Sequence, residues 1–333
     1  MNGRAGLRCT STDLTRFEAY SLTVPARRTA PEFTGTPTPS ACKPSVSLAI
    51  CTRDRAAALQ ECLCAIQQLA PAPDEVIVVD NSAGNPEIER IALEAGARYC
   101  VESGTGLSRA RNRALLESRH EVVAFIDDDA VPRKDWLYYL LAPYADEHVA
   151  AVTGETASNA QHAELAKHHP QRTISNTDPL WFEMANFGGL GFGTNMSLRK
   201  RCCREESFFD VRLGRGAPIR IAEESHAFTT LIARGYRAVH VPAAIVLHPE
   251  KPRNVAQEAM ASFAYWLLLF VEFPGHRGDL ARFLIRRLMR KPLGWPRDPH
   301  GPGEIINSGL SVKLRALFGG VRLYLKARKL NAR

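Results

Sequence analysis

Short apolar segments alternate with helical patterns through the first half of the chain, and this alternation restricts the fold more than any other feature. Apolar runs of strand length occupy residues 46–51, 75–80, 98–101, 121–126 and 149–153. The first segment between them has apolar residues at helical spacing, namely Leu59, Cys62, Leu63 and Ile66. Strands that alternate with helices favour parallel pairing with helices on both faces. We therefore predict an α/β fold with a single, mainly parallel sheet.

The rest of the chain is less regular. Residues 188–195 form a glycine-rich loop before a short strand, residues 222–234 have a helical pattern, and residues 239–248 are typical of a last strand. From residue 253 onward we predict a helical, basic extension. Residues 1–44 contain prolines and no periodicity, so we expect a disordered leader without a packed core.

Composition narrows the class of protein. The 333 residues are 45% apolar and 23% charged, which is typical of a soluble globular protein and excludes a largely disordered chain. The longest apolar run, residues 261–271, is shorter than the roughly 20 residues that cross a bilayer. The eight cysteines include no C-x-x-C pair, and no apolar signal segment begins the sequence. We therefore predict reduced thiols and a cytoplasmic location.

The positive charge is concentrated near the C-terminus. Residues 274–333 contain 14 Lys and Arg against 3 Asp and Glu, a local charge of +11 in a chain of +8. Residues 280–290 and 313–329 mix basic and apolar side chains at helical spacing. Such helices can lie on an anionic membrane surface, which would place the protein peripherally at its inner face. The alternative is a pair of helices that cover the core. No motif supports nucleic-acid binding, so we predict none.

Polar side chains follow three of the predicted strands. Thr52, Arg53 and Asp54 follow the first strand, Asp80 ends the second, and residues 127–129 follow the fourth. Ligands of parallel sheets bind outside the carboxyl ends of the strands, so these side chains predict a binding site. Asp80 can contact a ribose or base there, or belong to an Asx turn. Asp54 can also cap the following helix.

Asp127, Asp128 and Asp129 are the strongest chemical signal. Three adjacent negative charges are costly unless water or a cation neutralises them. Oxygen-rich sites of this kind suit Mg²⁺ or Mn²⁺, which can share ligands with a diphosphate. The alternative is a solvated acidic turn in which Asp129 faces the positive end of the next helix.

Two helix starts carry further candidates. The helix that follows residues 104–106 carries Arg111, and a helix N-terminus with guanidinium groups suits a diphosphate. Glu223 and Glu224 begin a later helix, where an acid can be a general base or can simply stabilise the helix dipole. His248 follows the last strand, so a ligand role is one interpretation of it.

Five motifs in order resemble glycosyltransferase family 2, whose members have the GT-A fold and invert the anomeric centre. The resemblance covers residues 46–250 and rests on residues 47–54, 76–81, 106–112, 123–129 with Pro132, and 193–197. It implies a nucleotide-sugar-binding half at 45–155, an acceptor-binding and catalytic half at 156–250, and a helical basic region at 251–333, after the leader at 1–44.

The resemblance also implies roles for single residues. The nucleotide-sugar donor is expected to contact Thr52, Arg53, Asp54, Asp80, Arg111, Asn112, Asp127 and Asp128. Asp127 and Asp129 match the outer acids of the family's D-x-D motif, so both are expected metal ligands, together with His248. The acceptor is expected beside Gly193, Thr194, Asn195 and Glu223.

The expected catalytic base is Glu224, because the pair Glu223-Glu224 matches the family's Glu-Asp pair. The second acid is longer than the family's aspartate by one methylene, which leaves Glu223 as an alternative base.

The function implied by this resemblance is inverting, Mg²⁺- or Mn²⁺-dependent sugar transfer to an acceptor hydroxyl on a glycan, a lipid-linked molecule or a small molecule. A UDP- or dTDP-linked donor is expected rather than a GDP-linked one. The alternative is a non-catalytic protein of the same fold that binds a nucleotide or glycan. A sugar-nucleotide pyrophosphorylase ranks last, because the glycine-rich signature loop near the first strand is absent.

Overall fold

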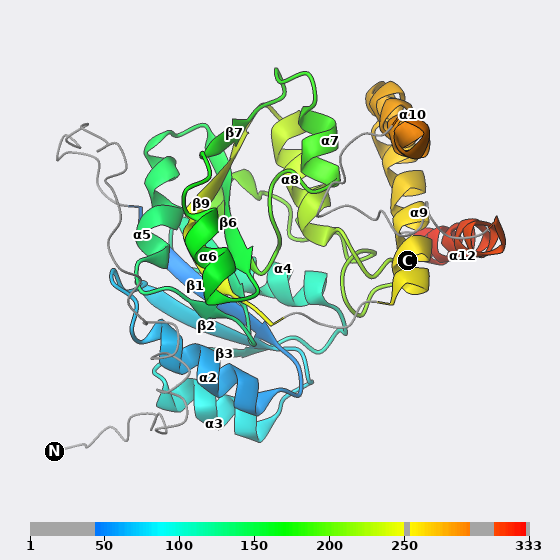
Figure 1. Cartoon of the computed structure of the whole chain (residues 1–333). Coiled ribbons are helices and arrows are strands. Elements are labelled where there is room, and N and C mark those ends of the chain that lie inside the picture. Colours follow the sequence, from blue (N-terminus) through cyan, green and yellow to red (C-terminus); the bar gives the residue numbers. More distant parts are fainter. Residues whose placement is uncertain (1–43, 250–253, 294–309, 331–333) are drawn as a thin grey trace, which may run out of the picture.

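The computed structural model describes residues 44–249, 254–293 and 310–330, and their elements surround one central sheet (Figure 1). The predicted leader at 1–44 therefore lies outside the described residues except for its last position. The division of the chain into two halves stays a prediction, since strands from both halves belong to the same nine-stranded sheet.

The first half supplies four parallel strands in the spatial order β3-β2-β1-β4. Their bounds are β1 (Val46–Thr52), β2 (Glu75–Asp80), β3 (Arg98–Val101) and β4 (Val122–Asp127). Helices connect them: α2 (Ala56–Ile66), α3 (Pro86–Glu94) and α4 (Leu107–Glu117). In register, Thr52 lies opposite Asp80, and Cys51 lies opposite Asp127. The expected strand ends therefore meet at one edge of the sheet.

The later strands continue the sheet in the order β8, β6, β9 and β5, while β7 pairs with β9. These strands are β5 (Val131–Pro132), β6 (Val149–Ala157), β7 (Arg172–Ile174), β8 (Asn195–Arg199) and β9 (Arg237–Leu247). β8 runs antiparallel to β4 and β6, so the sheet is mixed. This reversal brings the glycine-rich loop before β8 to the carboxyl end of β4.

Helices cover both faces of the sheet (Figure 1). The helices between β4 and β9 are α5 (Trp136–Leu141), α6 (Ala160–Ala166), α7 (Trp181–Asn186) and α8 (Glu223–Ala233), with short 3-10 turns at Ala142–Ala145 and Lys200–Cys202. Beyond the sheet lie α9 (Val255–Glu272), a 3-10 turn (Pro274–His276), α10 (Arg277–Leu293) and α12 (Leu310–Arg328). The prediction of an α/β fold with a helical C-terminal region is confirmed.

The core has two layers, one on each face of the sheet. Leu48 and Ile50 of β1 pack with residues of α2, α3 and α5, whereas Ala49 between them packs on the side of α4, α7 and α8. Successive side chains of a strand point to opposite faces, so a strand covered on both sides is apolar throughout. This explains why the first strands appear in the sequence as uninterrupted apolar runs.

Asp54 does not cap α2, contrary to one expectation. The helix begins after Arg55, and Asp54 has a φ of 53°, which turns the chain away.

Cys64 is disulfide-bonded, so the expectation of reduced thiols is wrong there, whereas five other described cysteines are free. None of the helices in the described ranges combines the length and apolar character needed to span a bilayer.

Candidate functional site

The carboxyl ends of β1 and β4 are joined by a network of charged groups. The hydroxyl of Thr52 donates to Asp128 at 2.7 Å, and both side chains are buried. Arg55 bridges two acids, with one guanidinium nitrogen 2.6 Å from Asp128 and another 2.6 Å from Asp129. Burial raises the pKa of Asp128, while Thr52 and Arg55 act against this rise. Asp128 therefore holds β1 and β4 together.

Asp127, Asp129 and His248 converge at the edge of the sheet. Nε2 of His248 lies 3.1 Å from Oδ1 of Asp129 and 3.8 Å from Oδ2 of Asp127. One ligand atom from each of these three residues lies within 4.8 Å of the others. Thr194 donates to Asp127 at 2.9 Å and fixes the orientation of that carboxylate.

This donor set fits a divalent cation. Two carboxylates and an imidazole at this separation can share one ion, and three partly buried side chains leave coordination positions for water or a substrate oxygen. The imidazole suits Mn²⁺ better than Mg²⁺, which prefers oxygen ligands throughout. The expected metal-ligating residues are thus brought together.

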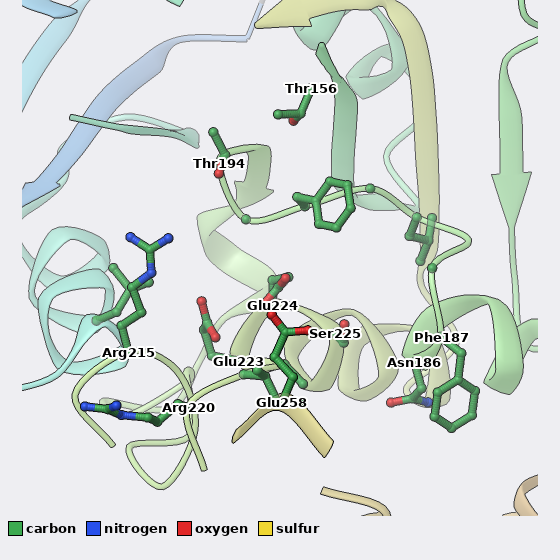
Figure 2. A pocket seen from close by; sticks show the side chains of 18 of the residues that line it. Thr156, Asn186, Phe187, Thr194, Arg215, Arg220, Glu223, Glu224, Ser225 and Glu258 are labelled. Carbon is green, nitrogen blue, oxygen red and sulfur yellow. The ribbon is translucent and has the colours of Figure 1, made fainter. Parts of the chain in front are cut away.

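A cavity of about 800 Å³ opens beside this cluster. Asp127, Thr194 and His248 contribute to its wall, as do Arg111, Glu223 and Glu224. Figure 2 shows Glu223 and Glu224 near the middle of the cavity, with Arg215 and Arg220 to one side and Asn186 and Phe187 to the other. The volume lies in the range of small-molecule binding sites.

Glu223 is paired with a buried arginine. Nη1 of Arg111 donates to Oε1 of Glu223 at 2.7 Å, and Nη2 lies 3.9 Å from Asp127. Burial acts to lower the pKa of Arg111, but the charges of Glu223 and Asp127 raise it overall, so Arg111 is cationic. The guanidinium therefore connects the acid pair of α8 to the cluster at β4.

Two glycines make room for this pair. A Cβ at Gly193 would lie 2.6 Å from Nη2 of Arg111, and a Cβ at Gly214 would lie 3.0 Å from Cδ of Glu223. Gly214 also has a φ of +89°, a conformation that strains other residues. Gly193 therefore lets Arg111 approach, and its expected contact with the acceptor stays a prediction.

Glu224 differs chemically from its neighbour. Its pKa is raised to about 8, mainly by burial and further by the negative charge of Glu223, while Arg111 acts in the opposite direction. Its side chain lines the cavity, and its role as the base stays a prediction. A carboxylate with a raised pKa is a stronger proton acceptor once it is deprotonated.

Several predicted donor contacts point inward instead. Asp80 is fully buried and accepts hydrogen bonds from the backbone of Ser82 and Asn85 and from the Tyr99 hydroxyl. Burial would raise the pKa of Asp80, but these bonds lower it overall. Its role in this structure is to hold the turn after β2, and a contact with a base or ribose stays a prediction.

Asn112 and Asn195 are also engaged with the protein. The amide of Asn112 both donates to and accepts from the backbone of Phe209. Asn195 is fully buried, accepts from Trp136 at 2.8 Å and donates to the carbonyl of Ala244. Neither residue lines the cavity. Both position loops at its edge.

Arg53 and Asp54 are exposed at the end of β1, 3.8 Å apart, and they lie outside the cavity wall. Sequence reasoning missed Arg55 between them and α2, as well as Arg215, Arg220 and the cavity-facing residues of α9. A cation one residue beyond the predicted strand-end cluster was the available signal for Arg55. Nothing in the spacing of the α9 residues distinguishes them from core positions.

A second acidic cluster is filled by an arginine. Ligand atoms of Asp210, His226 and Glu272 lie within 4.8 Å of one another. Arg212 pairs with both Asp210 and Glu272, so a guanidinium already neutralises the two acids. This network fastens the loop before α8 to the end of α9.

Comparisons with known proteins find a family and relatives for this chain. Residues 47–205 match the family described as glycosyl transferase family 2. The chain is 25% identical over 187 residues to a glucosyl-dolichyl phosphate glucuronosyltransferase of Haloferax volcanii, covering 51% of this chain and 57% of that protein. It is 31% identical over 212 residues to a pre-mycofactocin glycosyltransferase of Mycobacterium tuberculosis, covering 62% of this chain and 43% of that protein. The chain thus spans about half the length of these relatives.

Among solved structures, a mannosyltransferase of Pyrobaculum calidifontis in complex with GDP-Man and Mn²⁺ superposes with a TM-score of 0.56. The two chains share 18% sequence identity, and the superposition covers 96% of this chain and 94% of the other. At this identity the likeness concerns the fold, including the helical C-terminal region.

Proposed function

Since the chain belongs to glycosyltransferase family 2 through residues 47–205, we propose that it transfers a sugar from a nucleoside-diphosphate sugar to an acceptor hydroxyl with inversion. One observation carries the proposal. Asp127 and His248, which form a cation cluster with Asp129, line the same cavity of about 800 Å³ as a basic carboxylate, Glu224. A transferase needs both at once, one for the leaving group and one for the nucleophile.

The donor diphosphate belongs at the cluster end of the cavity. Asp127, Asp129 and His248 would hold Mn²⁺, with Mg²⁺ as the alternative ion, and Thr194 fixes the orientation of Asp127. A bound divalent ion would offset the negative charge that develops on the departing nucleoside diphosphate. We propose a UDP- or dTDP-linked donor.

The nucleophile is the acceptor hydroxyl, and Glu224 takes its proton. As the O–H bond breaks, the hydroxyl oxygen bonds to the anomeric carbon opposite the leaving group, and the carbon–oxygen bond to the diphosphate breaks. One such displacement gives inversion without a covalent glycosyl-enzyme. Glu223 is less available to the acceptor, because its carboxylate is held by Arg111 at 2.7 Å.

The second candidate is a protein that binds a nucleotide or glycan without transferring sugar. The observation that favours it is the pKa of Glu224 at about 8, since most of this carboxyl is then protonated at neutral pH.

For the transferase, a hydroxyl acceptor on a glycan, a lipid-linked molecule or a small molecule agrees equally with the open cavity. A cytoplasmic location and peripheral membrane contact also remain proposals.

The test is release of nucleoside diphosphate from a panel of UDP-, dTDP- and GDP-linked sugars, with and without Mn²⁺ and with pooled acceptors. We expect Mn²⁺-dependent release that Glu224→Gln abolishes while donor binding, measured by calorimetry, is kept. Donor binding without release from any acceptor pool would support the binding protein instead. Release that persists in Glu224→Gln would assign the base elsewhere.

A further inference from the structure

The two opposite faces of α12 differ in burial. Its buried face packs on α9: Ala316 and Ala327 are buried, and a Cβ at Gly320 would lie 2.5 Å from Cβ of Phe263. Gly319 approaches Met260 in the same way. The two glycines bring the helices close together, so the rotation of α12 about its own axis is set, and so is the face that it turns outward.

The outward face is an apolar stripe, which we define as Leu314, Leu317, Phe318, Val321 and Leu325. These side chains are 37–70% exposed, and Phe318 is the most exposed at 70%. Their spacing of three or four residues puts them in one row along the helix. A row of five large apolar side chains in water marks a surface that another phase or molecule covers.

Cations accompany the stripe. Arg315, Arg322 and Lys326 each follow a stripe residue by one position, which places them along one edge of the row. Lys329 extends this edge just past the end of α12, and Arg328 lies on the other side. All five are exposed, and residues 310–333 contain no acid. No ion pair joins these five to any other residue in the described ranges. Their charge is therefore available to an external anion.

We propose that the stripe and its cations dock the protein on the surface of a membrane that contains anionic lipids. The apolar row would enter the boundary between headgroups and acyl chains, while the cations would contact lipid phosphates. A second copy of the chain fits less well, because pairing two stripes would bring two rows of like charge together. Binding to an acidic groove of another protein, or to a nucleic acid, would engage the cations but leave the apolar stripe exposed to water.

The stripe lies close to the cavity described above. Glu258, Ser262, Tyr265 and Trp266 of α9 line the cavity, whereas Met260 and Phe263 of the same helix meet α12. α12 thus lies one helix layer, about 10 Å, behind the cavity wall. Docking would hold the cavity close to the headgroup layer. Binding to vesicles can be measured without any transfer activity, so its failure would leave the proposed function standing.

The experiment is vesicle flotation of the full chain with phosphatidylcholine alone and with added phosphatidylglycerol, at low and high salt. We expect binding only to the anionic vesicles and loss of binding at high salt. Phe318→Ser with Leu325→Ser should weaken binding by about tenfold or more. Arg322→Glu with Lys326→Glu should do the same.

Matched controls lie elsewhere on the surface. Leu93→Ser and Leu116→Ser remove exposed apolar side chains of α3 and α4, and Lys134→Glu with Arg204→Glu reverses two exposed charges. These variants should float like the parent protein, and thermal unfolding should be unchanged in all of them. Equal flotation of helix and control variants would overturn the proposal. So would absence of flotation, or a dimer in light scattering that Phe318→Ser with Leu325→Ser dissociates.

Discussion

Arg111 donates to Glu223 at 2.7 Å, and this contact makes two adjacent acids of α8 chemically unequal. Glu223 has its charge neutralised at the side of the cavity, whereas Glu224 has a pKa raised to about 8 by burial and by the charge of Glu223. A pair that appears symmetrical in the sequence is thus divided into one acid that positions an arginine and one that can accept a proton.

Replacing each acid by glutamine should separate these roles. Glu224→Gln keeps the shape of the cavity but removes the proton acceptor, so kcat should fall by about 10²-fold or more at unchanged donor affinity. Glu223→Gln leaves Arg111 buried without its closest partner and should lower the free energy of unfolding by about 3 kcal/mol. Steady-state kinetics, donor titration and chemical denaturation measure these effects. Equal kcat losses without a stability difference would contradict the division.

The raised pKa of Glu224 predicts the pH dependence of the rate. Only the deprotonated carboxylate can accept a proton, so kcat/KM should increase by about tenfold per pH unit well below the pKa and level off above about pH 8. The pH profile of Glu224→Gln should lack this increase. A parent profile that is flat between pH 6 and 8 would contradict the raised pKa of Glu224.

The same shift predicts the pH dependence of stability, with the opposite sign from the usual carboxylate. The folded protein holds the Glu224 proton more tightly than the unfolded chain, whose pKa is near the ordinary 4.5. The resulting stabilisation is complete below pH 4.5 and is lost as the pH rises toward 8. Because glutamine does not ionise, Glu224→Gln should gain stability relative to the parent between pH 5 and 8. Denaturation series at these pH values test the sign, and a constant difference would contradict it.

The strand-end side chains could be predicted because parallel strands end at the same edge of a sheet. Thr52 and Asp80 are register partners, and Cys51 is the partner of Asp127, so the observed edge is the expected one. Residue type was sufficient there, because each strand is an uninterrupted apolar run whose end is marked by the first polar side chain.

Side-chain direction within a loop could not be predicted. Thr194 and Asn195 are adjacent and polar, yet Thr194 faces Asp127 in the cavity while Asn195 is buried against Trp136. The difference depends on where β8 begins. The contact of Arg55 with the acids that follow β4 could not be predicted for a similar reason, because it depends on the positive φ of Asp54, which turns the chain.

The cation cluster predicts a difference between two adjacent aspartates. Asp129→Asn removes a carboxylate from the set formed with Asp127 and His248 and should weaken Mn²⁺ binding by about tenfold or more. Asp128→Asn is the matched control, because Asp128 lies outside this set and bonds to Thr52 and Arg55. It should lower the free energy of unfolding by about 1–3 kcal/mol while Mn²⁺ affinity is largely kept. Calorimetric Mn²⁺ titration decides, and equal affinities in both variants would contradict the ligand assignment.

Gly193→Ala should disturb the site through a single methyl group. The new Cβ would lie 2.6 Å from Nη2 of Arg111, a side chain held by Glu223 and only 3% exposed, so the guanidinium must move away from its partner. We expect a loss of about 1–3 kcal/mol in stability, together with reduced transfer. Gly278→Ala in α10 is the control, because no atom lies within 4 Å of its added Cβ and alanine favours a helix. If both alanine variants unfold at the parent temperature with parent activity, close approach at Gly193 does not hold Arg111 in place, and the link between the acid pair and the cluster at β4 loses its support.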